Sequence, residues 1–122
     1  RTFTERLNQL WWRLDAQYDL DACYQSARAY GIEYLKSGVT TVFDHHASFG
    51  SIRGSLYEIE RAAKETGVRS CLCYEISDRD GKDKARDSVM ENAEFIDHPD
   101  VDEILGTEAA AYEFIEKKMS AK

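Results

Sequence analysis

The stretch "SGVTTVFDHHASFG" at residues 37–50 decides the fold. The β-branched and aromatic side chains of residues 40–43 predict a strand. A helix that ends near Gly38 is expected before it, because glycine is a common helix stop. Three polar side chains directly follow the predicted strand: Asp44, His45 and His46. The stretch therefore predicts a helix, a strand and then a polar loop, which is the start of an α/β unit.

Capping and turn residues divide the rest of the chain. Thr2 and Glu5 form a capping box that predicts a first helix, and Ser55 and Glu58 form another that predicts a helix ending at Gly67. Residues 68–76, "VRSCLCYEI", predict a second strand. Strands that alternate with helices favour right-handed βαβ units and a parallel sheet, so the predicted fold class is α/β.

Beyond the second strand the sequence predicts a polar loop and a helix that runs to about residue 97. The apolar side expected for this helix consists of Val89, Met90, Ala93 and Ile96. His98 and Pro99 break it, and a last helix is expected from about Thr107. Residues 98–122 are accordingly interpreted as a helical tail. Two strands are too few for a complete parallel sheet, so we expect either further strands or a larger assembly.

Composition excludes several classes of partner. The 122 residues carry a formal net charge of −7 and 43% hydrophobic residues, which argues for a globular domain and against a nucleic-acid backbone or an anionic membrane as partner. No apolar run approaches the roughly 20 residues of a membrane span. The three cysteines lack the spacing of a zinc ribbon and indicate reduced thiols in a cytoplasmic protein.

The side-by-side histidines have three interpretations. Neighbouring strand residues point to opposite faces, so His45 and His46 cannot easily bind one metal ion. They can instead anchor a loop by hydrogen bonds, or one of them can contact substrate and transfer protons. Alternation further predicts that Asp44 and His46 meet Glu75 at one mouth, while Phe43 and the bulky residues of the second strand face the helices.

Four motifs in order carry a resemblance to a known family. They are "LWWRLD" at residues 10–15, "SGVTTVFDHHAS" at residues 37–48, "GSLYEI" at residues 54–59 and "GVRSCLCYEISDRDG" at residues 67–81. Together they resemble the amidohydrolase superfamily, and within it the aminohydrolases and chlorohydrolases of selenium metabolism (the SsnA type). The resemblance covers about residues 1–97.

This resemblance implies a partial (β/α)8 TIM barrel of a metal-dependent hydrolase that cleaves C–N bonds of a small nitrogenous substrate. The chain would supply the second and third strand–helix units. The divalent metal, zinc or iron, would be bound by residues of the parent enzyme, and none is expected in this chain alone. The candidates for lining the substrate pocket are Asp44, His45, His46, Glu75 and Asp78.

Two functional hypotheses follow. The first is a segment of a metal-dependent aminohydrolase or deaminase that is inactive as an isolated chain, with a small molecule as the parent's substrate. The second is a non-catalytic α/β scaffold or binding module. Two parallel strands leave exposed edges, which favour self-association, so a homo-oligomer is expected.

Overall fold

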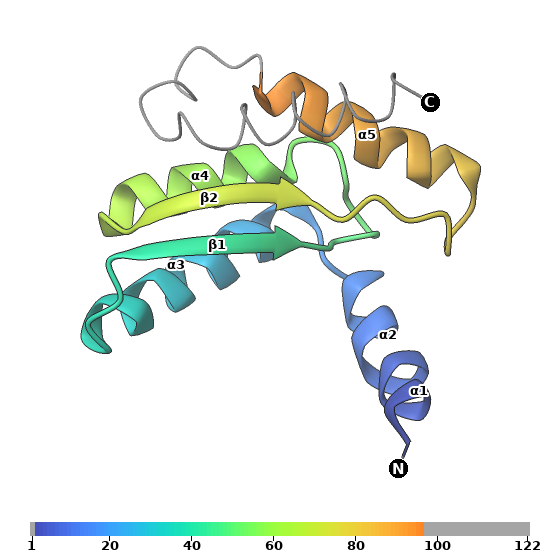
Figure 1. Ribbon diagram of the computed structural model, residues 1–122, viewed down its shortest axis with the longest axis horizontal. Coiled ribbons are helices and arrows are strands. Elements are labelled where there is room, and N and C mark those ends of the chain that lie inside the picture. The colour runs from blue at the N-terminus through green and yellow to red at the C-terminus, as the bar shows by residue number, and fades with distance from the viewer. Residues whose placement is uncertain (1, 97–122) are drawn as a thin grey trace, which may run out of the picture.

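A computed structural model describes residues 2–96 as a parallel pair of strands with helices beside it (Figure 1). The elements follow the order α1 (Phe3–Arg6), η1 (Leu7–Trp11), α2 (Trp12–Asp15), α3 (Leu20–Lys36), β1 (Thr41–His46), α4 (Ser55–Thr66), β2 (Arg69–Tyr74) and α5 (Lys82–Ile96). Helix α3 packs against α4, and α4 and α5 both contact β2. The expected α/β class and parallel pairing are confirmed, and the described part of the chain contains one two-stranded sheet.

Strand β1 is longer than the sequence predicted. The polar residues Asp44, His45 and His46 were expected beyond the strand, but they form its second half. Their backbone is held in the parallel ladder, where Asp44 lies opposite Leu72 and His46 lies opposite Tyr74. The ladder continues past β2, because the Glu75 N–H donates to the His46 carbonyl at 2.8 Å. Backbone pairing with β2 thus overrides the weak strand propensity of the polar residues.

The first helical segment begins as predicted. The Glu5 N–H donates to Thr2 Oγ1 at 3.3 Å, and the Thr2 N–H donates to Glu5 Oε2 at 2.8 Å, which is the reciprocal pattern of a capping box. The segment then widens into a π-helical turn over Leu7–Trp11 before α2. Figure 1 shows these short helices projecting away from the ends of the strands.

Helix α4 begins differently from the prediction. Its N-cap residue is Gly54, and no capping-box hydrogen bond forms between Ser55 and Glu58, because Ser55 Oγ donates to the Ile52 carbonyl instead. Two backbone N–H groups at the start of α4 are satisfied from another helix. Glu91 of α5, which is fully buried, accepts from the Gly54 N–H at 2.7 Å and from the Leu56 N–H at 2.9 Å. A buried carboxylate therefore caps α4 and binds α5 to it.

Helix α5 presents a different side from the predicted one. Val89 and Met90 are 41% and 39% exposed, which makes the expected apolar face wrong for these two residues. The buried side consists of Ser88, Glu91, Asn92 and Phe95. Three of these four are polar, and hydrogen bonds compensate their burial. Hydrophobic periodicity could not find a face whose contacts are mostly hydrogen bonds.

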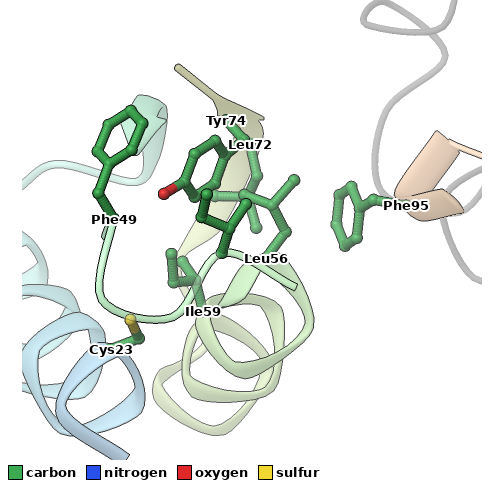
Figure 2. Packing of buried hydrophobic residues seen from close by; sticks show 8 residues of the cluster. Cys23, Phe49, Leu56, Ile59, Leu72, Tyr74 and Phe95 are labelled. Atoms are coloured by element: carbon green, nitrogen blue, oxygen red, sulfur yellow. The ribbon is translucent and has the colours of Figure 1, made fainter. Parts of the chain in front are cut away.

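The hydrophobic core lies between the sheet and the helices. Figure 2 shows side chains from α3, the loop after β1, α4, β2 and α5 meeting there: Cys23, Phe49, Leu56, Ile59, Leu72, Tyr74 and Phe95. Tyr74 also fixes the loop, because its hydroxyl oxygen accepts from the Ser48 N–H at 2.9 Å.

The loop after β1 lies tightly against the α2–α3 connection at Gly50. A Cβ atom at this position would come within 2.6 Å of the Ala16 and Tyr18 carbonyl oxygens. The Gly50 N–H donates to the Asp15 carbonyl at 3.0 Å. Only glycine permits this approach, which sets the position of α2 relative to the strand ends.

Two sequence predictions remain to be placed. The break at His98 and Pro99 and the last helix from about Thr107 lie outside the described residues. In the region from residue 2 to residue 96, none of the helices combines the length and the apolar character that crossing a membrane requires.

Candidate functional site

A cavity of about 440 Å³ lies on the helix side of the sheet. Its size falls within the range of small-molecule sites. Strand β1 contributes alternate residues to its wall: Val42, Asp44 and His46. Helix α3 contributes a row of small residues at four-residue spacing: Cys23, Ala27 and Gly31. Several aromatic side chains also line it: Trp11, Tyr18, Tyr30 and Tyr34.

His46 is the most strongly perturbed titratable group in this cavity. Its Nε2 lies 3.6 Å from the Cys23 Sγ, and its ring meets Tyr74 edge-on at 5.7 Å between ring centroids. Burial, followed by the neighbouring charge of His45, lowers the pKa of His46 from 6.5 to about 4. Burial also raises the pKa of the Cys23 thiol. At neutral pH the two groups therefore form a neutral imidazole–thiol pair, which is not an activated nucleophile.

Asp44 lines the same cavity, where its side chain is partly buried. Burial raises the pKa of its carboxyl, and the charge of His45 opposes this increase only in part. Among residues 2–96, no side chain forms a hydrogen bond or ion pair with the Asp44 carboxylate. A desolvated carboxylate without a partner is costly, so this wall of the cavity favours a cationic group or a hydrogen-bond donor.

Arg79 joins the carboxyl ends of the strands to α2. Its guanidinium contacts Asp15 Oδ2 at 2.7 Å and Glu75 Oε1 at 2.9 Å, and it lies 4.1 Å from the centre of the Phe49 ring. The pKa of Asp15 is nevertheless raised, because burial outweighs the attraction of Arg79. An arginine beside a strand end can either bind an anionic substrate or form ion pairs within the protein. In the structure it forms ion pairs.

Asp44, His46 and Glu75 were predicted to meet at one mouth, on the face of the sheet that points away from the helices. This assignment of faces is wrong. Phe43 was expected to meet the helices but is 78% exposed on the opposite side of the sheet. The register places Asp44 and His46 on the same face as Leu72 and Tyr74, toward the helices. Glu75 belongs instead to the ion pairs around Arg79. Alternation along each strand was correct, but sequence alone gave no register and no assignment of faces.

The five candidate residues thus lie in four places. Asp44 and His46 line the cavity, and His45 is exposed on the other face of the sheet. Glu75 follows β2 beside Arg79. Asp78 is exposed in the loop, where its carbonyl accepts from the Gly81 N–H at 3.0 Å.

Two residues of this region were missed by the sequence reasoning. Cys23 was interpreted only as a buried thiol, because nothing in the sequence brings it to His46, 23 positions later. Asp15 was quoted as part of the motif "LWWRLD", but its pairing with Arg79 spans 64 positions. Neither contact has a local sequence signal.

Comparisons with known proteins give the chain distant relatives. No family model matches the sequence, and no solved structure matches it. The chain is similar to two curated deaminases. It is 31% identical over 84 residues to 5-methylthioadenosine/S-adenosylhomocysteine deaminase 2 of Archaeoglobus fulgidus, a match that covers 69% of this chain and 18% of that protein. It is 29% identical over 86 residues to 5'-deoxyadenosine deaminase of Methanobrevibacter smithii, covering 70% of this chain and 18% of that protein.

The chain therefore spans about a fifth of the length of the curated relatives that it matches. Both relatives are named as deaminases, which agrees with the class of hydrolase that the four motifs implied. The narrower resemblance to the SsnA type stays a prediction.

Proposed function

We propose that the chain is a segment of a deaminase-type hydrolase that cleaves a C–N bond of a small nitrogenous substrate. The observation that carries this proposal is the similarity to two deaminases over more than two thirds of the chain. The parallel strands support it, since α/β enzymes gather ligand contacts at the carboxyl ends of such strands. In the proposed parent, β1 and β2 are the second and third strands of a (β/α)8 barrel.

The metal of the proposed parent must be bound by other residues. Within residues 2–96 no group of three or more histidine, cysteine, aspartate or glutamate side chains is arranged to bind a metal ion. His46 and Cys23 are close to each other, but two ligands do not make a zinc or iron site. We propose that the zinc or iron that the amidohydrolase resemblance implies is bound elsewhere in the parent, and we expect the isolated chain to be inactive.

The contribution of this chain is positioning. Arg79 holds Asp15 and Glu75 together, so that α2 and the end of β2 keep a fixed relation at the end of the sheet. Substrate contacts are proposed for residues that have space or exposure near this end: Asp44, His45, His46, Glu75 and Asp78. His46 is neutral at physiological pH, so it can donate or accept a hydrogen bond without carrying charge.

A segment exchange tests the proposal. The matching segment of the Archaeoglobus fulgidus deaminase is replaced by the corresponding part of this chain, and a second chimera carries the same residues in shuffled order. We expect the first chimera to fold, to retain bound metal and to release ammonia from 5-methylthioadenosine, and the shuffled chimera to do none of these. A chimera that folds and binds metal but releases no ammonia would contradict the proposed function. One that does not fold would contradict the equivalence of the two segments.

A second candidate function is a non-catalytic module that self-associates in the cytoplasm. The observation that favours it is the exposed face of the sheet, where Phe43 is 78% accessible. Sedimentation of the 122-residue chain tests it, with Phe43→Lys as the matched variant. A dimer that dissociates in the variant supports this function, and a monomer at every concentration contradicts it.

A further inference from the structure

The cavity beside β1 carries negative charge in its wall. Two carboxylates line it, Asp15 from α2 and Asp44 from β1. Among the described residues that line it, none is a lysine or an arginine. His46 adds no positive charge at neutral pH, because burial lowers its pKa to about 4. The cavity therefore repels an anionic ligand and attracts a cationic one.

The two carboxylates differ in how far other charges compensate them. The guanidinium of Arg79 lies 2.7 Å from Asp15 Oδ2 and forms an ion pair with it. For the Asp44 carboxylate, the contacts within residues 2–96 include neither a hydrogen bond nor an ion pair. Burial of a carboxylate without such contacts costs free energy, which a ligand with suitable donors would recover. The positive charge of a ligand is therefore expected at Asp44.

Aromatic side chains line the same cavity. Tyr30 and Tyr34 of α3 stack on each other, with 6.0 Å between their ring centroids and 28° between their planes. Trp11 of η1 also lines the cavity. Tyr30 and Trp11 are 60% and 55% exposed, so both rings keep apolar area that a ligand can cover. Aromatic faces also attract cations, so these rings favour a flat ligand of the same charge as Asp44 favours.

The size of the cavity and the shape of a carboxylate narrow the ligand further. The volume of about 440 Å³ lies toward the lower end of the range for small-molecule sites. A carboxylate accepts two parallel N–H bonds from a planar group such as an amidinium or a guanidinium. Two hydroxyl groups in the wall, those of Ser26 and Ser70, offer further acceptors for its N–H groups.

We propose that the cavity between β1 and α3 binds a small aromatic cation, with an amidinium or guanidinium group on the Asp44 carboxylate and a ring against Trp11, Tyr30 and Tyr34. The cavity has room for the ring as well as for the charged group, so the ligand is a free small molecule rather than the tip of an arginine side chain. This assignment concerns what the chain itself binds, and it holds whether or not the parent is a deaminase.

A nuclear magnetic resonance titration of the 122-residue chain at neutral pH tests the proposal, with benzamidine as the probe. Two compounds serve as controls: benzamide has the same ring without the charge, and butylguanidinium has a planar cation without the ring. We expect benzamidine to shift the backbone signal of Asp44 and the ring signals of Tyr30, with a Kd of about 1 mM or tighter. Each control should bind at least about fivefold more weakly.

Substitutions separate the contribution of the charge from that of the rings. Asp44→Asn should weaken benzamidine binding at least about tenfold, and removal of an uncompensated charge should leave the fold intact. Asp83→Asn is the matched control, because it removes the same charge from an exposed position of α5 outside the cavity lining; it should leave the Kd unchanged. Tyr30→Leu should weaken binding about two- to fivefold. Thermal unfolding of each variant confirms that the fold is retained.

Several results would overturn the proposal. Benzamidine that causes no shift up to about 10 mM would show that the cavity is not a site for such cations. Equal binding of benzamide would show that it takes rings without regard to charge, and equal binding of butylguanidinium would make an arginine-type side chain the occupant. An unchanged Kd in the Asp44→Asn variant would place the cation elsewhere. Because no readout depends on catalysis, these outcomes are independent of the segment exchange.

Discussion

Replacing His46 should remove a large part of the acid sensitivity of this fold. The pKa of His46 is lowered from 6.5 to about 4 in the folded chain, first by burial and then by the charge of His45. Between these two pH values the unfolded chain binds a proton at this position and the folded chain does not. The contribution of His46 to the free energy of unfolding is therefore complete above about pH 6.5 and is lost as the pH falls toward about 4.

The magnitude follows from the two pKa values. At about 1.4 kcal/mol for a change of one in pKa, the difference corresponds to a loss of about 3 kcal/mol. The carboxyl groups of Asp15, Asp44 and Glu91 have raised pKa values, so each of them works in the opposite direction as the pH falls. The difference between the wild-type chain and a variant isolates the histidine.

The assay is urea unfolding followed by tryptophan fluorescence, at several pH values from about 7 to about 4. Between these pH values, the free energy of unfolding of the His46→Gln variant should fall by about 3 kcal/mol less than that of the wild-type chain. His45→Gln is the matched control, because this neighbour is exposed and its loss should leave most of the pH dependence in place. Parallel pH profiles for the wild-type and His46→Gln chains, or a proton resonance of His46 that titrates near pH 6.5, would refute the reasoning.

Three further substitutions test the contacts that hold the helices in place. Glu91→Gln should lower the free energy of unfolding by about 1–3 kcal/mol, because it weakens the cap of α4. The control is Glu94→Gln, whose side chain is half exposed and whose loss should cost less than about 0.5 kcal/mol. The urea midpoints of the two variants are compared. Gly50→Ala should lower the free energy of unfolding by about 1–3 kcal/mol, since the added Cβ meets two backbone carbonyl oxygens. An unchanged thermal midpoint would contradict the close approach of the loop backbone to the α2–α3 connection. Arg79→Lys should lower the free energy of unfolding by about 2 kcal/mol, because one ammonium cannot contact both partly buried carboxylates. Arg13→Lys, at an exposed position, should leave it unchanged in the same urea assay.

Local signals in the sequence were reliable where the contacts are local. The capping box of Thr2 and Glu5 and the helix stop at Gly67 join residues within one turn, so their side chains alone determine them. The parallel pairing of the two strands was also predictable, because a helix between two strands leaves few topologies.

The incorrect predictions share a physical cause, which is pairing between distant residues. Glu91 caps a helix that begins 36 positions earlier, and this replaced the capping box expected at Ser55. Asn92 bonds to the edge of β2, which turned a polar side of α5 inward against the apolar pattern. The register of β1 on β2 determined which face meets the helices, and no residue within β1 encodes that choice.

The cap that Glu91 provides also has a consequence for the order of folding. During synthesis, the first turn of α4 emerges about 35 residues before the carboxylate that satisfies its backbone. Until then, water or transient partners must solvate those N–H groups, and a short isolated helix is only marginally stable. Helix α4 therefore gains this cap only when α5 docks, so this part of the chain should fold as a late and cooperative unit rather than turn by turn behind the ribosome.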